Sequence, residues 1–170
     1  MSESQALETR LQALESRLGS LEGAEDIRRL KARYGQLADS RYGPDGPKEK
    51  GELETIARQI SELFTPDAVW DGGKALGTCR GREEIYARFL EPTLNFSWHY
   101  FVKPQIWVEG DRARGCWDIL AACTSRKGEP QWMAGYQEDE YRRLDGQWLH
   151  SSLRLQVVFL APYERGWVKR

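Results

Sequence analysis

The first 22 residues carry leucines at alternating steps of four and three. They are Leu7, Leu11, Leu14, Leu18 and Leu21. This spacing is the a/d alternation of a heptad repeat and predicts a helix that packs on another helix. Because a short isolated helix is marginal in water, we expect residues 1–22 to dock on the protein's own domain or on a neighbouring subunit. About two heptads do not decide between these partners.

Helical spacing continues through the first half of the chain. An apolar stripe runs through residues 24–41, after a break at Gly23. A turn rich in glycine and proline then leads to a second helical pattern over residues 48–64. A short strand is predicted at residues 68–70 and a further helix at residues 81–90. This half of the chain is therefore mainly helical.

The second half of the chain is typical of strands. Four long segments are rich in aromatic and β-branched residues, at residues 98–108, 112–124, 132–143 and 147–160. Gly110 and the Asp145-Gly146 pair give tight turns between them, which favours antiparallel hairpins. Pro104 cannot donate a ladder hydrogen bond, so it indicates an edge strand or a bulge. Helices first and strands afterwards predict an α+β fold with the helices on one face of a bent sheet.

Length and charge exclude several classes of partner. The chain has 170 residues, the size of one domain. Its 25 Lys and Arg nearly balance its 26 Asp and Glu, and no basic face appears, so we expect no nucleic-acid partner. No apolar stretch approaches the ~20 residues that span a bilayer, so no membrane partner is expected. The amino terminus lacks the features of an export signal, so we expect a cytoplasmic protein.

Several motifs sharpen this prediction. They are Asp26-Ile27-Arg28-Arg29-Leu30 with Tyr34 and Asp39, Leu63-Phe64-Thr65-Pro66-Asp67-Ala68-Val69-Trp70, Gly81-Arg82-Glu83-Glu84-Ile85, and Ser97-Trp98-His99. With the order of elements, they resemble the SnoaL-like branch of the NTF2-like superfamily, which includes scytalone dehydratase, bile-acid 7α-dehydratase and lindane dehydrochlorinase. The resemblance implies a cone of helices over a strongly curved, mostly antiparallel sheet in residues 23–170, with an extra N-terminal helix. It identifies the fold better than the reaction, because this scaffold hosts many functions.

The resemblance also implies roles for four side chains. His99 matches the family's general base, Asp39 the carboxylate that orients this base, and Tyr34 a hydroxyl donor of the dehydratases. Arg154 lies on the last strand, near where related eliminating enzymes carry an arginine. The chain departs from scytalone dehydratase because residues 117–125 contain no second histidine. That departure argues against the same substrate and the same proton relay.

Chemistry alone leaves each of these residues a structural alternative. His99 is one of two histidines, the residue type best suited to proton transfer at neutral pH, but it can also simply pack among neighbouring aromatic residues. Asp39 follows Tyr34 by five residues, about 140° around a helix, so both reach one cavity only if the helix ends or distorts there. Tyr34 lies on the apolar stripe, where a core role fits equally well. Arg154 shares strand parity with Trp148, His150, Ser152 and Gln156, and the sequence does not tell whether this face lines a cavity.

We expect no cofactor and no metal. No His, Cys, Asp and Glu grouping has metal-ligand spacing, and no phosphate-binding glycine loop or nucleophile elbow occurs. Cys79, Cys116 and Cys123 are expected to be reduced, buried thiols. The 7 Trp, 7 Tyr and 5 Phe indicate a pocket for a small hydrophobic or aromatic ligand, or simply a bulky core.

The sequence therefore predicts a cofactor-independent lyase. The expected reaction is a dehydration of a small cyclic or aromatic hydroxylated substrate by a His-Asp general base pair, His99 and Asp39. An isomerase or cyclase would need almost the same residues. A non-catalytic ligand-binding or accessory subunit is the alternative from another class, and the leucine-spaced helix supports it. Because relatives commonly assemble, we expect a homodimer or homotrimer.

Overall fold

The computed structural model describes residues 2–167. Residue 1 of the predicted N-terminal segment and residues 168–170 of the predicted domain lie outside the described residues. The helices are α1 (Glu3–Asp39), α2 (Lys50–Glu62), α3 (Gly73–Leu76) and α4 (Gly81–Leu90). The strands are β1 (Tyr42–Gly43), β2 (Gly46–Pro47), β3 (Phe64–Asp71), β4 (Thr78–Arg80), β5 (Phe96–Glu109), β6 (Arg112–Thr124), β7 (Pro130–Leu144) and β8 (Gln147–Pro162).

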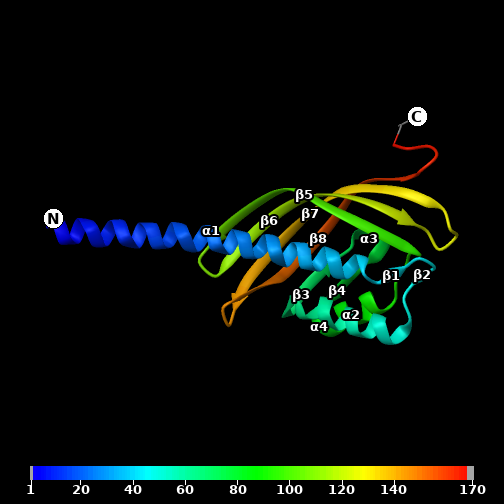
Figure 1. Ribbon diagram of the computed structural model, residues 1–170, viewed down its shortest axis with the longest axis horizontal. Coiled ribbons are helices and arrows are strands. Elements are labelled where there is room, and N and C mark those ends of the chain that lie inside the picture. The colour runs from blue at the N-terminus through cyan, green and yellow to red at the C-terminus, as the bar shows by residue number, and fades with distance from the viewer. Residues whose placement is uncertain (1, 168–170) are drawn as a thin grey trace.

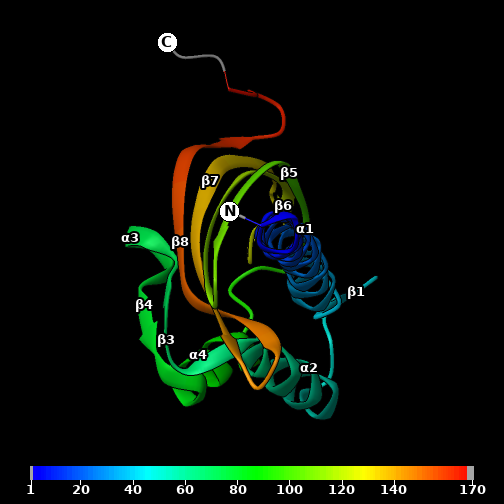
Figure 2. The same cartoon turned by 90° about the vertical axis from the view of Figure 1, so that its left-hand side faces the viewer.

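Six of the strands form one curved sheet in the order β4-β3-β8-β7-β6-β5. Antiparallel hairpins join β5 to β6, β6 to β7 and β7 to β8, whereas β3 pairs with β8 in parallel. The long helix α1 and the shorter α2 and α4 lie on the inner side of this curve (Figure 2). The α+β prediction is confirmed, with a mostly antiparallel sheet and an extended N-terminal helix.

The helix α1 is continuous over 37 residues, so the predicted break at Gly23 is wrong. The Ser2 hydroxyl caps its start by accepting a hydrogen bond from the Gln5 backbone N–H, and the Gln5 side chain accepts one from the Ser2 N–H. A glycine inside a helix costs about 1 kcal/mol relative to alanine. Here it permits a close approach, because a Cβ at Gly23 would lie 3.3 Å from the Trp148 ring and from Val108. Gly23 therefore marks where the helix meets the sheet.

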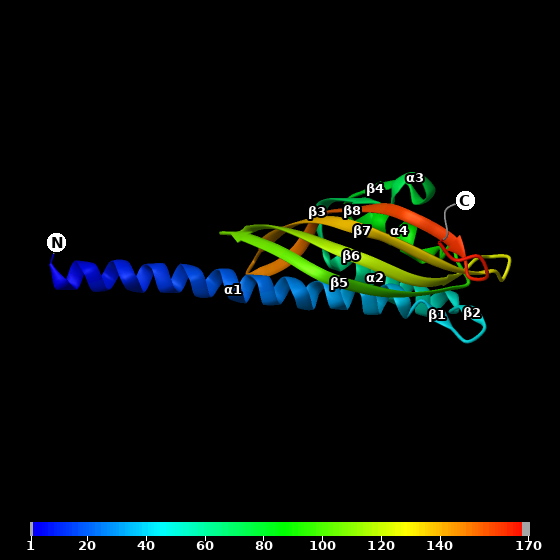
Figure 3. The same cartoon turned by 90° about the horizontal axis from the view of Figure 1, so that it is seen from above.

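The first part of α1 leaves the domain entirely. Residues 3–22 project past the end of the sheet as a single helix (Figure 1, Figure 3). Gly23 is the first buried residue of α1. The domain thus leaves this segment uncovered, although its leucine spacing predicts a packing partner.

The strand β5 lies at one edge of the sheet and carries a bulge at Pro104, as the sequence predicts. The pairing with β6 shifts between Val102 and Gln105, and Lys103 adopts a φ of 51°. A bulge bends its strand and increases the local twist. On the inner side of the sheet, β5 packs along α1, which brings the beginning of β5 to the end of α1.

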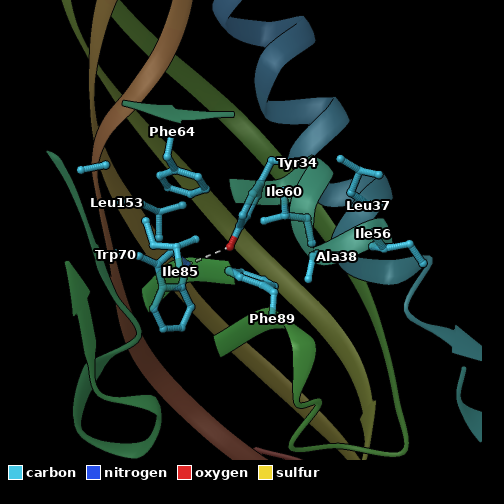
Figure 4. Packing of buried hydrophobic residues seen from close by; sticks show 12 residues of the cluster. Tyr34, Leu37, Ala38, Ile56, Ile60, Phe64, Trp70, Ile85, Phe89 and Leu153 are labelled. Carbon is cyan, nitrogen blue, oxygen red and sulfur yellow. Dashed lines mark hydrogen bonds between the residues drawn. The ribbon is translucent and has the colours of Figure 1, made fainter. Parts of the chain in front are cut away.

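The main core lies between the helices and the inner face of the sheet. Figure 4 shows its centre, where Tyr34 of α1 packs against Phe64 and Phe89. Ile60 and Ile85 are fully buried in the same cluster. Burying one such side chain contributes about 1.5–3 kcal/mol, so this cluster is a major source of stability.

Candidate active site

A cavity of about 660 Å³ opens between the helices and the inner face of the sheet. Its lining is mainly apolar, with Trp70, Phe89 and Phe101 among the aromatic side chains and Ile119 and Leu155 among the aliphatic ones. The volume falls within the range of about 300–1,000 Å³ that is usual for small-molecule sites. The fold thus contains an aromatic-lined cavity large enough for a ring compound.

His99 lines this cavity and forms a pair with Asp39. The His99 Nδ1 atom lies 2.5 Å from Asp39 Oδ1, and the His99 backbone N–H donates to Asp39 Oδ2 at 2.9 Å. One carboxylate therefore holds both the ring and the backbone of the histidine. Because the carboxylate accepts the Nδ1 proton, Nε2 is the ring nitrogen that remains free to accept another proton.

The helix ends at Asp39, which is one of the two conditions, an end or a distortion, that the angle between Tyr34 and Asp39 set. Asp39 is the last residue of α1, and Ser40 ends the helix with an ordinary hydrogen bond to the Gln36 carbonyl. Tyr34 lines the cavity. Asp39 does not line it but binds the Nδ1 side of the His99 ring on β5. The separation of about 140° between Tyr34 and Asp39 is therefore what this arrangement requires.

Tyr34 is buried in the core and also lines the cavity. Its hydroxyl accepts a hydrogen bond from Trp70 Nε1 at 3.1 Å, and no acceptor for its own proton occurs among residues 2–167. Burial, partly opposed by the bond from Trp70, raises the pKa of Tyr34 to about 12. The hydroxyl therefore stays protonated at neutral pH and can donate a hydrogen bond to a ligand.

Arg154 does not join the other three predicted residues. The pairing of β7 with β8 shifts between Glu140 and Tyr141, which leaves Ser151 as an extra residue in β8. This bulge reverses the side-chain parity after His150. Arg154 accordingly lies on the outer face, with 62% of its side chain exposed and its Nε atom 3.7 Å from Asp71 Oδ2.

The second histidine, His150, belongs to the core. Its ring stacks on Phe64 at 5.0 Å between centroids and also lies against Tyr141. Neither ring nitrogen has a hydrogen-bond partner among the described residues. Burial, helped by the charge of Lys31, lowers the pKa of His150 well below 6.5. The ring is therefore neutral, and its 3.8 Å contact with Asp139 is not an ion pair.

A buried polar cluster next to the cavity was not predicted. Lys31 of α1 donates to Asp139 Oδ2 at 2.6 Å and to the Gln137 amide oxygen, and Tyr141 donates to the same Asp139 oxygen at 2.8 Å. Burial lowers the pKa of Lys31 and raises the pKa of Asp139, and their ion pair opposes both changes. Because an ammonium group only donates, it binds the oxygen of Gln137 and leaves the amide NH₂ for the cavity that Gln137 lines.

Two further small groups line the cavity. The Ser97 hydroxyl is buried and has no hydrogen-bond partner among residues 2–167, which makes it available to a ligand. Burial raises the pKa of Cys123 to about 11, so this cysteine is a thiol at neutral pH rather than a nucleophilic thiolate.

Neither a metal-binding cluster nor a membrane-spanning helix occurs among residues 2–167. Among the described residues, no group of three or more His, Cys, Asp or Glu side chains could hold a metal ion. Within residues 2–167, no helix is both long enough and apolar enough to cross a membrane.

A curved sheet closed by helices over an apolar cavity is the NTF2-like architecture. The model of one family, the SnoaL-like domain, matches residues 53–154, which is more than half of the chain. The chain belongs to the SnoaL-like family. No curated protein matches its sequence.

Solved structures support the same assignment at the level of the fold. A type 2 hexachlorocyclohexane dehydrochlorinase is 22% identical with a TM-score of 0.67, over 90% of this chain and 92% of the other. A proposed scytalone dehydratase from Novosphingobium aromaticivorans is 18% identical with a TM-score of 0.68, over 88% and 91%. An NTF2-like protein of the same organism is 26% identical with a TM-score of 0.63, over 93% and 92%. The fold is therefore shared with small-molecule enzymes of the lyase type.

Proposed function

We propose that this protein is a cofactor-independent lyase that dehydrates a small cyclic or aromatic hydroxylated compound. The observation that carries the proposal is the His99-Asp39 pair, whose free Nε2 belongs to a ring that lines an apolar cavity. Two structural neighbours, a dehydrochlorinase and a proposed scytalone dehydratase, are named as eliminating enzymes. They support this reaction class for the present chain.

In the proposed reaction, His99 Nε2 removes a proton from the carbon next to an activating carbonyl group. The electron pair of that C–H bond moves onto the carbonyl to give an enolate, and the enolate collapses to form the new double bond as the neighbouring C–O bond breaks. The departing hydroxide takes the proton back from the imidazolium and leaves as water, so His99 returns to its neutral form. Asp39 keeps the proton on Nδ1 and stabilises the imidazolium between the two steps.

Tyr34 stabilises negative charge by hydrogen bonding in this scheme. Since its pKa is about 12, it keeps its own proton and donates a hydrogen bond to the carbonyl oxygen as an enolate develops. The Gln137 NH₂ group, held by Lys31, is a second neutral donor on the cavity wall. Arg154 has no part in this scheme, because its side chain lies on the outer face of β8.

The test uses a bicyclic β-hydroxy ketone whose dehydration gives a fluorescent naphthol. We expect turnover by the native protein, and a loss of about 10²–10⁴-fold in His99→Gln, the usual contribution of a general base. Asp39→Asn should also lose activity. An amide has no negative charge to stabilise the imidazolium, and it does not fix the proton on Nδ1 as a carboxylate does. Arg154→Ala is the matched control on the outer face and should keep the native rate.

The same assay separates the alternatives. Exchange of the proton next to the carbonyl with solvent deuterium, without loss of water, would indicate an isomerase rather than a dehydratase. Saturable binding of the ketone with neither exchange nor product would instead favour a ligand-binding protein. Turnover that is unchanged in His99→Gln would contradict the mechanism.

A further inference from the structure

The cavity contains unpaired positive charge. Arg41, Lys74 and Arg88 line it, whereas none of the described lining residues is an Asp or Glu. The Asp39 carboxylate is paired with His99 and does not line the cavity. A mainly apolar cavity with three basic side chains and no acidic one favours a ligand that brings its own negative charge.

Arg41 is the more buried of the two arginines, with 9% of its surface exposed. Its Nε donates to the Ala38 carbonyl at 3.0 Å and its Nη1 to the Phe89 carbonyl at 3.4 Å. Its guanidinium lies 4.9 Å from the centre of the Phe89 ring. No carboxylate oxygen lies within 4.0 Å of it in residues 2–167. A buried cation is usually paired, so Arg41 lacks its expected partner.

Arg88 also lacks an acidic partner among the described residues. Its Nε is buried without a hydrogen-bond partner in the described residues, and its Nη atoms donate to the Glu91 carbonyl at 3.3 Å and the Thr93 hydroxyl at 3.4 Å. It likewise forms no ion pair within the part of the chain that the structure describes. Both arginines line the cavity. Burial lowers the pKa of Arg41 and the charge of Arg88 lowers it further, so the two guanidinium groups lie close enough to interact.

We propose that Arg41 and Arg88 bind a carboxylate carried by the ring substrate, which makes the substrate a cyclic or aromatic carboxylic acid. The planar guanidinium matches the two oxygens of a carboxylate, and such bonds are among the stronger ones in proteins. The apolar wall would then hold the ring against His99. This inference rests on the proposed function only for the reaction and not for the binding.

Binding of three matched probes to the full-length protein tests this subsite by calorimetry. We expect naphthoate to bind about tenfold or more tightly than naphthamide, its neutral analogue. Arg88→Met should remove most of this preference. Arg29→Met is the control, because Arg29 lies exposed on α1 away from the cavity. Arg41→Met serves as a second variant if thermal unfolding shows that it folds, since its side chain also ties α1 to α4.

The outcomes are distinct. Equal affinity for naphthoate and naphthamide, or an unchanged preference in Arg88→Met, would overturn the anion subsite. Tighter binding of naphthyl phosphate than of naphthoate would overturn the carboxylate assignment. His99→Gln should keep the preference for naphthoate while losing turnover. A preference for naphthoate with no dehydration of any ketone, by contrast, would reject the proposed reaction and leave the subsite standing.

A second inference comes from an independent feature, the projecting part of α1. Its five leucines are each 55–69% exposed: Leu7, Leu11, Leu14, Leu18 and Leu21. Leu21 precedes Ile27, the first core residue of α1, by six residues, so the two side chains point about 120° apart around the helix. The leucine stripe therefore faces away from the sheet and leaves room for a second helix.

The charged residues beside the leucines indicate the sequence and the orientation of that second helix. With Leu11 and Leu18 at a positions, the e positions hold Glu8, Glu15 and Glu22, and the g positions hold Arg10 and Arg17. In a parallel pair, each g residue meets the e residue of the next heptad. Arg10 would then meet Glu15 of the partner subunit, and Arg17 would meet Glu22 of the partner subunit. In an antiparallel pair, arginine would face arginine and glutamate would face glutamate.

This charge pattern points to a second copy of the chain, bound through residues 3–22 as a parallel two-stranded coiled coil. Glu3, a g residue in the first turn, is the exception to the pattern. The heptad ends where Glu25 and Arg28 take the next a and d positions, just as the domain begins. A parallel arrangement places the two domains side by side at the same end of the coil.

Light scattering on the full-length chain tests the assembly. We expect twice the chain mass of 19.6 kDa for the native protein, and the single mass for Leu11→Glu combined with Leu18→Glu. Ser16→Glu, at the outward f position, is the control and should remain dimeric. A monomeric native protein, or a dimer that survives the double variant, would overturn the inference. A triple mass would overturn the two-stranded form.

Disulfide trapping tests the orientation. Ser4 occupies an a position, so Ser4→Cys should form an intermolecular disulfide under mild oxidation only if the two helices run parallel. The native protein, oxidised in the same way, controls for Cys79 and Cys116, which are partly exposed. A Ser4→Cys dimer by mass that fails to cross-link would contradict the parallel orientation.

Discussion

At the scale of single residues, the site depends on groups that the fold leaves with one unused hydrogen-bonding function. His99 keeps a free Nε2 because Asp39 takes the Nδ1 side. Tyr34 keeps a free proton because its hydroxyl accepts from Trp70 and meets no acceptor among residues 2–167. Gln137 keeps its NH₂ because Lys31 takes its oxygen. Each group is held on its far side by the core, which is how a cavity obtains fixed polar groups at low conformational cost.

The buried, neutral His150 predicts a stability that falls as the pH falls. The pKa of His150 in the folded protein lies well below 6.5. As the pH falls below 6.5, the unfolded chain therefore binds a proton at His150 and the folded chain does not, so the free energy of unfolding decreases. Lys31 in the same cluster opposes protonation further. We expect a loss of roughly 2 kcal/mol between pH 7 and pH 5 that His150→Phe abolishes. Urea unfolding of both proteins at the two pH values measures this, and equal pH slopes would contradict it.

The Lys31-Asp139 pair predicts a large cost for removing the lysine. Lys31→Met would leave a buried carboxylate without its cation, and we expect a loss of about 3–5 kcal/mol in urea unfolding. Adding Asp139→Leu should recover part of this loss. Lys103 and Asp118 form an exposed pair on the sheet, so Lys103→Met is the matched control and should cost less than about 1 kcal/mol. A similar cost for the two lysines would show that Lys31 contributes only packing.

The sequence could predict some of these residues but not others. The family resemblance implied roles for His99, Asp39 and Tyr34; in the structure Asp39 pairs with His99, and His99 and Tyr34 both line the cavity. Lys31 lies on the same helical stripe as Ile27 and Tyr34, but its burial was not predicted because a charged side chain usually occupies a solvated position. The outward placement of Arg154 depends on a bulge in β8 that arises from pairing between strands, which no local pattern reveals.

At the scale of elements, the strand and helix types are largely readable from the chain. The predicted helix at residues 81–90 agrees with α4, and the four long strands agree within a few residues at each end. The error at Gly23 has a physical origin in tertiary packing, because only contact with Trp148 and Val108 explains a glycine inside a long helix. The low helix propensity of glycine cannot by itself distinguish a glycine that ends a helix from a glycine inside a helix that packs closely against a neighbouring strand.

Two glycines of α1 give a matched test of this point. Replacing glycine by alanine inside a helix stabilises it by up to about 1 kcal/mol, and we expect this gain for Gly19→Ala, where nothing lies within 4 Å of the new Cβ. At Gly35 the Cβ would lie 2.9 Å from the Phe101 ring, so Gly35→Ala should destabilise the protein. Because Phe101 stacks on His99, turnover should fall as well. Thermal unfolding measures both, and equal stabilisation would contradict tight packing of α1 on β5.

At the scale of the whole molecule, α1 serves two separate tasks along one axis. Its second part, from Gly23 to Asp39, carries Lys31 and Tyr34 into the core and ends at the carboxylate that holds His99. Its first part buries nothing in its own domain. A continuous helix joins the two, so the position of the cavities in the proposed dimer is fixed by the coiled coil.

This division predicts that residues 23–170 fold and function without the N-terminal segment. Among the described residues 2–22, none is buried, so deleting residues 1–22 should leave the core intact. Glu25 and Asp26 would then lie in the first turn, where acidic side chains stabilise a helix. We expect the free energy of unfolding of the isolated domain to stay within about 1 kcal/mol of that of the monomeric Leu11→Glu, Leu18→Glu double variant. Binding of naphthoate should be unchanged, because Gly23 and everything that lines the cavity remain. Urea unfolding and calorimetry on the two monomers make the comparison. Loss of binding in the deletion alone would mean that the projecting helix supports the cavity after all.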